Sequence, residues 1–280
     1  MSLLTHLRLN TTVIALSIIT TLFSTTVTAE IVFSAPPRES AETGMKLYGP
    51  LAEHLSKVIG EKVVYEHPKT WRNYQSKMQK GKYSIIFDGP HFAAWRVSKN
   101  MHSPAIKLHG DLNFVLVADV NNKSINKADD LIGKTVCALP SPNLGTLTLY
   151  SMFTNPVQQP VMKFVQTGGV KEVAKNFIDK KCDGAILRTG YFKKKLTDEQ
   201  RKTMRVISEK GVTTNQGLTV SRKLGEQTLR RIVTSLSTDE GRKAMQPILS
   251  RFTKKNEYKL ASATDYDGHN LLIDNMIFGW

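Results

Sequence analysis

Short apolar runs alternate with amphipathic stretches along the chain from about residue 30 onwards. Apolar residues recur at helical spacing between Tyr48 and Ile59, and Gly60 ends this pattern. Short runs of mostly apolar residues between such stretches predict β-strands. In the first part of the chain we expect strands at 31–35, 62–65 and 83–87, and helices at 48–59, 71–79 and 92–98.

The same alternation starts again after an apolar run at 114–119. Here we expect strands at 134–139, 161–166 and 184–187, and helices at 126–131, 144–153 and 170–178. Two β-rich pieces follow within 206–220, and the chain closes with expected helices at 226–236, 241–252 and 270–278. This rhythm predicts two α/β units, each with a mainly parallel sheet flanked by helices.

The first 29 residues differ from the rest of the chain. Arg8 lies in a short polar start, an apolar stretch follows at 11–23, and the segment ends in Val27-Thr28-Ala29. This pattern is typical of a secretory signal peptide that is cleaved after residue 29. The alternative is a retained membrane anchor, although the apolar stretch falls short of the ~20 residues that a spanning helix needs. We expect an exported protein located in the periplasm.

The charge of the chain indicates an anionic partner. The 280 residues carry 39 Lys and Arg against 24 Asp and Glu, a formal net charge of +15. Arg8 is the only one of these charges before residue 30, so the exported form keeps +14 on 251 residues. Nucleic acid, an acidic membrane surface or a small oxyanion would fit such an excess. Because an exported chain has little access to nucleic acid, we expect no nucleic-acid partner.

Several short motifs resemble one known family in their order and spacing. They are Pro-Pro-Arg-Glu at 36–39, Tyr-Gly-Pro-Leu at 48–51, Gly-Lys-Tyr-Ser-Ile-Ile-Phe-Asp-Gly-Pro at 81–90, Leu-Ile-Gly-Lys-Thr-Val at 131–136 and Cys-Asp-Gly-Ala at 182–185. The chain is similar to the phosphate/phosphite/phosphonate-binding family of periplasmic solute-binding proteins of ABC transporters. The similarity extends over nearly all of the chain after the first 29 residues.

The resemblance implies a type II periplasmic binding protein fold of two α/β lobes, joined by two crossing strands that serve as a hinge. The crossings would lie at 112–120 and at about 214–220. One lobe would then comprise residues 30–115 and 216–280, and the other would comprise residues 116–215. Ligands of open α/β sheets bind at the carboxyl ends of the strands, so we expect the site in a cleft between the lobes.

The function implied is capture of a small anionic ligand, a phosphate- or phosphonate-like oxyanion, and its delivery to an ABC transporter permease. One alternative is a ligand-sensing partner of a membrane receptor or kinase that uses the same fold. The sequence lacks the G-x-S-x-G, P-loop, G-x-G-x-x-G and H-E-x-x-H motifs, and its seven histidines show no metal-ligand spacing. We therefore expect a monomeric, non-enzymatic protein without a cofactor or a metal.

Three polar side chains lie on the segment that leads into the expected helix at 144–153. Ser141, Asn143 and Thr146 could converge with backbone N–H groups on an anion at the start of this helix. The alternative is ordinary helix capping by Ser or Asn. This segment departs from the Ser/Thr-rich loop that is usual in phosphonate binders.

Three further candidates come from the first unit. Tyr48 matches the family tyrosine near the start of the first helix, where its hydroxyl could donate a hydrogen bond to a ligand. It also continues the apolar stripe of that helix, so a core position is the alternative. Asp88 and His91 belong to the turn after the strand at 83–87, where the family places ligand contacts. Turn formation and a solvated helix start are their alternatives.

Arg188 ends the expected strand at 184–187 and offers a guanidinium suited to bidentate binding of an oxyanion. Binders of amino-phosphonates tend to carry an acidic group near this position. The arginine therefore favours a ligand that is anionic without a balancing amine. The alternative is a structural arginine that pairs with a carboxylate of the other lobe.

Cys137 and Cys182 are the only cysteines and lie 45 residues apart, in or beside expected strands of the second unit. Because an exported protein meets an oxidising compartment, we favour a disulfide between them. Two buried thiols are one alternative. A redox or metal-handling protein that uses this thiol pair is the other.

Overall fold

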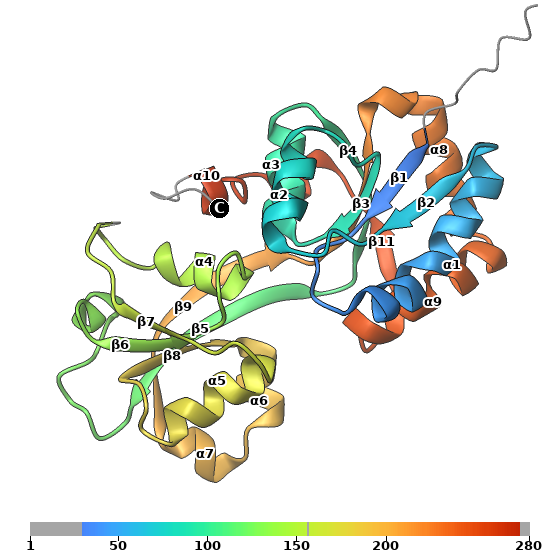
Figure 1. Cartoon of the computed structure of the whole chain (residues 1–280). Helices are drawn as coiled ribbons and strands as arrows, with labels where there is room; N and C mark the ends of the chain where they lie inside the picture. Colours follow the sequence, from blue (N-terminus) through green and yellow to red (C-terminus); the bar gives the residue numbers. More distant parts are fainter. Residues whose placement is uncertain (1–29, 156, 275–280) are drawn as a thin grey trace, which may run out of the picture.

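The computed structural model describes residues 30–155 and 157–274. The expected signal peptide at 1–29 and the end of the expected helix at 270–278 lie outside the described residues. The chain folds into two lobes, each built on a β-sheet with helices packed against it (Figure 1). Within the described residues no helix is both long and apolar enough to cross a membrane.

The first lobe contains a six-stranded sheet in the order β11-β4-β10-β3-β1-β2. Its strands are β1 (Ile31–Ser34), β2 (Val63–Glu66), β3 (Ile85–Asp88), β4 (His102–Leu108), β10 (Gly217–Ser221) and β11 (Tyr258–Leu260). Its helices are α1 (Ala41–Ile59), α2 (Trp71–Gln79), α3 (Pro90–Ser98), α8 (Gly225–Leu236) and α9 (Asp239–Phe252), together with η2 (Arg222–Leu224), η3 (Ala263–Tyr266) and α10 (Leu271–Asp274).

The two faces of this sheet support separate layers, because neighbouring residues of a strand point to opposite faces. Ile85 and Phe87 of β3 belong to the core under α1, α8 and α9, whereas Ile86 between them belongs to a cluster with residues of α2 and α3. The cap residues of α1 match its boundaries. Ser40 accepts a hydrogen bond from the amide of Thr43 at its start, and Gly60 takes the left-handed conformation at its end.

The second lobe contains a five-stranded sheet in the order β7-β6-β8-β5-β9. Its strands are β5 (Asp111–Asp119), β6 (Thr135–Ala138), β7 (Val161–Phe164), β8 (Gly184–Arg188) and β9 (Met204–Thr214). Its helices are η1 (Ala128–Leu131), α4 (Leu144–Tyr150), α5 (Gly169–Ile178), α6 (Thr189–Lys195) and α7 (Asp198–Lys202). One apolar cluster packs α4 and η1 against the sheet, and another packs α5 on its other side.

The lobes are joined by two adjacent crossings. The chain leaves the first sheet after β4 and enters the second at β5, and it returns between β9 and β10. The side-chain amide of Asn215 donates to the carbonyl of His109 at 3.1 Å, and the amide of Leu108 donates to the carbonyl of Gln216 at 2.8 Å. These bonds tie the two crossings to each other at the hinge.

The structure corrects two details of the expected fold. The first crossing lies at residues 109–110, so the lobe boundary expected after residue 115 falls inside β5, which belongs to the second sheet. The sheets are mixed rather than mainly parallel. In the first sheet, β1 pairs in parallel with β2 and β3, but β10 pairs antiparallel with β3 and β4 because it returns from the other lobe.

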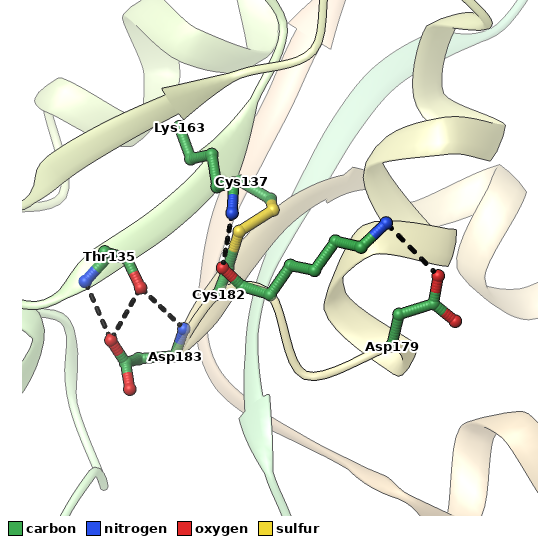
Figure 2. Close-up of a disulfide and its surroundings, with 7 residues drawn as sticks. Thr135, Cys137, Lys163, Asp179, Cys182 and Asp183 are labelled. Carbon is green, nitrogen blue, oxygen red and sulfur yellow. Dashed lines mark hydrogen bonds and ion pairs between the residues drawn. A yellow bond between two sulfur atoms is a disulfide. The ribbon is translucent and has the colours of Figure 1, made fainter.

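The disulfide expected between Cys137 and Cys182 is confirmed (Figure 2). It joins β6 to the residue just before the turn into β8, with 5.7 Å between the two Cα atoms, and both residues are buried. Beside it, the backbone amide and the hydroxyl of Thr135 both donate to the Asp183 carboxylate, at 2.8 and 2.7 Å. The redox or metal-handling alternative requires two free thiols, and both cysteines are instead joined in this disulfide.

Candidate functional site

A cavity of about 190 Å³ lies between the two lobes beside the hinge. Its size is below the range of roughly 300–1,000 Å³ that is usual for drug-sized ligands, so it suits a small molecule. The walls come from segments that follow β1, β3 and β6, from β5 and β8 themselves, from the N-terminal parts of helices and from the hinge. The lining residues are Arg38, Trp71, Gly89, Pro90, His91, Phe92, Leu112, Phe114, Leu139, Pro142, Asn143, Leu144, Gly145, Val170, Val173, Ile186, Arg188 and Gln216.

Arg38 is the cation that the first lobe contributes to the cavity. It follows β1 and is half-buried. Its Nη1 donates to Oε1 of Gln216 in the hinge at 2.8 Å, and its guanidinium carbon lies 5.8 Å from the centre of the Phe252 ring. No carboxylate among the described residues forms an ion pair with it. The guanidinium is therefore held in place by neutral groups and keeps its charge available.

Arg188 is the cation that the second lobe contributes. It is the last residue of β8 and pairs with Phe114 of β5 in the sheet register. Its side chain lines the cavity and is exposed, although the surrounding protein excludes enough water to lower its pKa. No hydrogen bond or ion pair connects the side chain to another described residue. The predicted position at a strand end is thus present, and the structural ion pair that was its alternative is not formed within the described residues.

The cavity has a positive potential. Among the described residues that line it, two are arginines and none is acidic. The first turn of α3 also lines it, and Gly89 at the N-cap provides no side chain to cap this nine-residue helix. The positive end of the helix dipole therefore adds to the potential of the two guanidinium groups. Such a site attracts anions and disfavours cations.

His91 lines the cavity and connects the two lobes. Its Nε2 lies 3.2 Å from the carbonyl oxygen of Pro142, which belongs to the segment before α4 in the second lobe. Burial, with a further contribution from the charge of Arg38, lowers the pKa of His91 to about 3. The ring is therefore neutral at physiological pH, and Nε2 carries the proton that it donates to Pro142. We assign His91 to the contact between the lobes beside the cavity.

Asp88 has a different position from the one expected. Its carboxylate is fully buried behind the cavity wall, where Nη1 and Nη2 of Arg96 donate to it at 2.6 and 2.8 Å. The hydroxyl of Tyr74 donates to the same carboxylate, and Nη2 of Arg96 donates also to Oγ1 of Thr219 at 2.8 Å. Asp88 is not among the lining residues. It joins β3, α2, α3 and β10 rather than facing a ligand.

Tyr48 also lies outside the cavity wall. Its side chain is fully buried in the core of the first lobe, where its ring packs at 5.9 Å from Phe33 and 5.0 Å from Tyr65. Burial raises the pKa of Tyr48, so the phenol stays protonated. Tyr48 therefore lies in the core as part of the apolar face of α1, which was the alternative to a ligand contact.

The start of α4 contributes Asn143 to the cavity, but the side chains of Asn143 and Thr146 bond to nearby backbone groups. Oδ1 of Asn143 accepts from the amide of Gly145 at 2.9 Å, and the buried hydroxyl of Thr146 donates to the carbonyl of Leu139 at 2.5 Å. Ser141, which precedes a cis peptide bond to Pro142, is not among the lining residues. Asn143 is thus the N-cap of α4, which is the capping alternative for this residue.

Sequence reasoning missed the residues that complete the cavity, above all Arg38, Gln216 and Trp71. Arg38 belongs to the Pro-Pro-Arg-Glu motif, so the family resemblance contained a signal for it. The position of Gln216 depends on the return of the chain through the hinge, which no local pattern reveals. Trp71 begins an amphipathic helix, where an aromatic side chain reads as a core residue.

Solved structures share this fold at low sequence identity. A Xanthomonas citri protein with bound chloride has 12% identity and a TM-score of 0.67, covering 88% of this chain and 99% of its own. A Prochlorococcus marinus protein in complex with methylphosphonate has 10% identity and a TM-score of 0.57, covering 88% and 97%. The binding-protein component of an ABC phosphonate transporter from Pseudomonas aeruginosa has 15% identity and a TM-score of 0.54, covering 88% and 84%. No curated protein matches the sequence.

A family model gives the assignment directly. Residues 33–266 match the model of the phosphonate periplasmic substrate-binding protein of ABC transporters. The match spans both lobes, the hinge and all of the lining residues of the cavity. The chain therefore belongs to the phosphonate-binding family of periplasmic substrate-binding proteins of ABC transporters.

Proposed function

We propose that this protein captures a small oxyanion of the phosphonate type in the cavity between its lobes and delivers it to an ABC transporter permease. The observation that carries this proposal is the pair of arginines, Arg38 and Arg188, which come from opposite lobes and have no acidic neighbour in the cavity wall. Guanidinium groups bind tetrahedral oxyanions through parallel N–H donors. The family assignment supports the same ligand class and a periplasmic location.

The two arginines also suggest how a permease distinguishes the ligand-bound protein from the free protein. An anion that contacts both lobes at once stabilises the closed arrangement by the difference between its affinities for the closed and the open states. Arg38 donates to the hinge residue Gln216, and Arg188 ends a strand that pairs with β5, the strand that directly follows the first crossing. We expect closure of the lobes around an anion to be the change that the permease recognises.

The test is a ligand screen on the purified protein, with phosphate, phosphite, sulfate, methylphosphonate, propylphosphonate, acetate and arsenate, followed by calorimetric titration. An anion at 100 times its Kd should stabilise the protein by about 2.7 kcal/mol, which raises the melting midpoint by roughly 5–11 °C. Hydrogen bonds to charged groups contribute about 1.5–3 kcal/mol, so Arg38→Gln and Arg188→Gln should each weaken binding roughly 10- to 100-fold.

The matched control is Arg231→Gln. Arg231 is exposed on α8 outside the cavity wall, and its replacement changes the net charge by the same amount. This variant should keep the wild-type affinity, because distant surface charge only steers anions towards the protein. The proposal is wrong if no anion of the screen shifts the midpoint, or if the two cavity variants bind like the control.

We also propose that residues 1–29 are removed on export and that the mature protein acts as a monomer. The mass of the protein recovered from the periplasmic fraction should then correspond to a chain that starts at Glu30. Light scattering should give the mass of one such chain. Recovery of the full-length chain in the membrane fraction would instead indicate a retained anchor.

A further inference from the structure

Besides the two arginines, most side chains that line the cavity are apolar. Trp71 of α2, Leu139 after β6 and Val170 of α5 are half-buried, so each keeps apolar surface that a ligand would cover. Phe114 and Ile186 lie more deeply, at 5% exposure each. Trp71 belongs to the first lobe, and the other four residues belong to the second lobe. A ligand between the lobes therefore meets apolar side chains of both.

The cavity is larger than an oxyanion head alone requires. An apolar cavity of roughly 150 Å³ is large enough to bind benzene, which has six carbon atoms. The cavity of this protein measures about 190 Å³, whereas phosphate has only five non-hydrogen atoms. The space that remains beside a tetrahedral head can therefore hold a short substituent, and most of the side chains that line the cavity are apolar.

An ammonium group would find no carboxylate in the described lining of the cavity. None of the described lining residues is acidic, and Arg38, Arg188 and the first turn of α3 all contribute positive potential. Placing a cation there without a carboxylate would leave a desolvated charge unpaired. An apolar group of the same size would instead gain from burial of its carbon atoms.

We propose, on the basis of the proposed function, that the ligand is an organophosphonate with a short, uncharged apolar substituent, and that the protein discriminates against aminoalkyl phosphonates and against inorganic phosphate. The head lies between Arg38 and Arg188. The substituent lies against Trp71 and Val170. Specificity thus comes from the apolar wall and from the absence of a carboxylate there, while the arginines supply the affinity for the head.

The experiment compares three compounds by calorimetric titration of the wild-type protein. Propylphosphonate and 2-aminoethylphosphonate have the same number of non-hydrogen atoms and differ in a terminal methyl or ammonium group, and inorganic phosphate lacks the substituent. Burial of a methylene contributes roughly a fourfold gain in affinity, so propylphosphonate should bind at least about tenfold more tightly than phosphate. It should also bind at least about tenfold more tightly than 2-aminoethylphosphonate.

A charge introduced into the apolar wall should change this preference. Val170→Asp places a carboxylate in the first turn of α5, where a helix N-terminus tolerates it. We expect this variant to bind 2-aminoethylphosphonate at least about tenfold more tightly than the wild type does and to bind propylphosphonate more weakly. The control is Val157→Asp, at a position that is 76% exposed and outside the cavity wall, which should keep the wild-type preference.

The outcomes separate this inference from the proposed function. Equal or tighter binding of 2-aminoethylphosphonate or of phosphate by the wild type, with loss of binding in Arg188→Gln, overturns the inference and leaves the oxyanion site intact. Absence of binding for all three compounds overturns the proposed function itself. The comparison of the three compounds requires no variant, so it remains decisive even where Val170→Asp does not fold.

Discussion

Replacing Asp88 by asparagine would leave the Arg96 guanidinium buried without its counter-charge. Both side chains are completely buried, and Arg96 donates two hydrogen bonds to Asp88 at 2.6 and 2.8 Å. Burial lowers the pKa of Arg96, but the charge of Asp88 and its hydrogen bonds raise it by more, so the arginine keeps its proton. The pair therefore depends on both of its members.

The expected cost follows from this geometry. Removal of one partner of a buried ion pair costs about 3–5 kcal/mol, because the remaining charge is uncompensated. For a chain of this size, that lowers the melting midpoint by roughly 6–20 °C. The double variant Asp88→Asn/Arg96→Met removes both charges and should recover part of this loss, because replacement of a whole buried pair by apolar groups is often close to neutral.

Thermal and denaturant unfolding should be measured for the wild type and both variants, together with the affinity of the folded proteins for propylphosphonate. The control is Asp179→Asn, which removes an exposed carboxylate that pairs with Lys175 at 2.8 Å and should unfold close to the wild type. Asp88→Asn should lose stability and keep its affinity. If Asp88→Asn kept the wild-type melting midpoint but no longer bound the anion, the structural role would be refuted. Asp88 would then have to be a ligand-binding residue.

Two further predictions concern stability. The disulfide between Cys137 and Cys182 closes a 45-residue separation, so the double alanine variant should lose about 4 kcal/mol of stability and keep its anion affinity; alkylation of both cysteines without reductant would contradict the bond. Burial lowers the pKa of His91 and of His102 to about 3, whereas the unfolded chain takes up these protons near pH 6.5. The free energy of unfolding should therefore fall as the pH drops from about 6.5 towards 3, by up to about 1.4 kcal/mol per pH unit for each histidine. Denaturant unfolding of His91→Gln should show a smaller dependence of this free energy on pH. An unchanged pH dependence would refute the contribution of His91.

The sequence predicted most elements of the fold because short apolar strands alternate with amphipathic helices. The strand β4 was missed because its seven residues include Pro104 and Lys107 and lack both alternation and a continuous apolar run. This strand is formed by pairing with β10 and β11, which come more than 100 residues later in the chain, so its local sequence does not reveal it. The short helix α6 was not expected either, because its seven residues end in three lysines and are too few to show an amphipathic repeat.

The site was predicted less completely because its geometry depends on distant partners. Arg188 was singled out because it comes at the end of a buried strand, and the structure shows that it lines the cavity. Arg38 was not singled out, since its position rests on Gln216, 178 residues away in the sequence. Asp88 was expected to face the ligand. Instead, Arg96 on α3 donates hydrogen bonds to its carboxylate in the interior of the first lobe. Local residue types alone cannot distinguish these two orientations.

The most direct test of the proposed binding site is a crystal structure of the protein with bound propylphosphonate. We expect the phosphonate oxygens within hydrogen-bond distance of the guanidinium groups of Arg38 and Arg188, and the propyl group against Trp71 and Val170. Phosphonate density elsewhere on the protein, or in the cavity with neither arginine in contact, would contradict the proposed site.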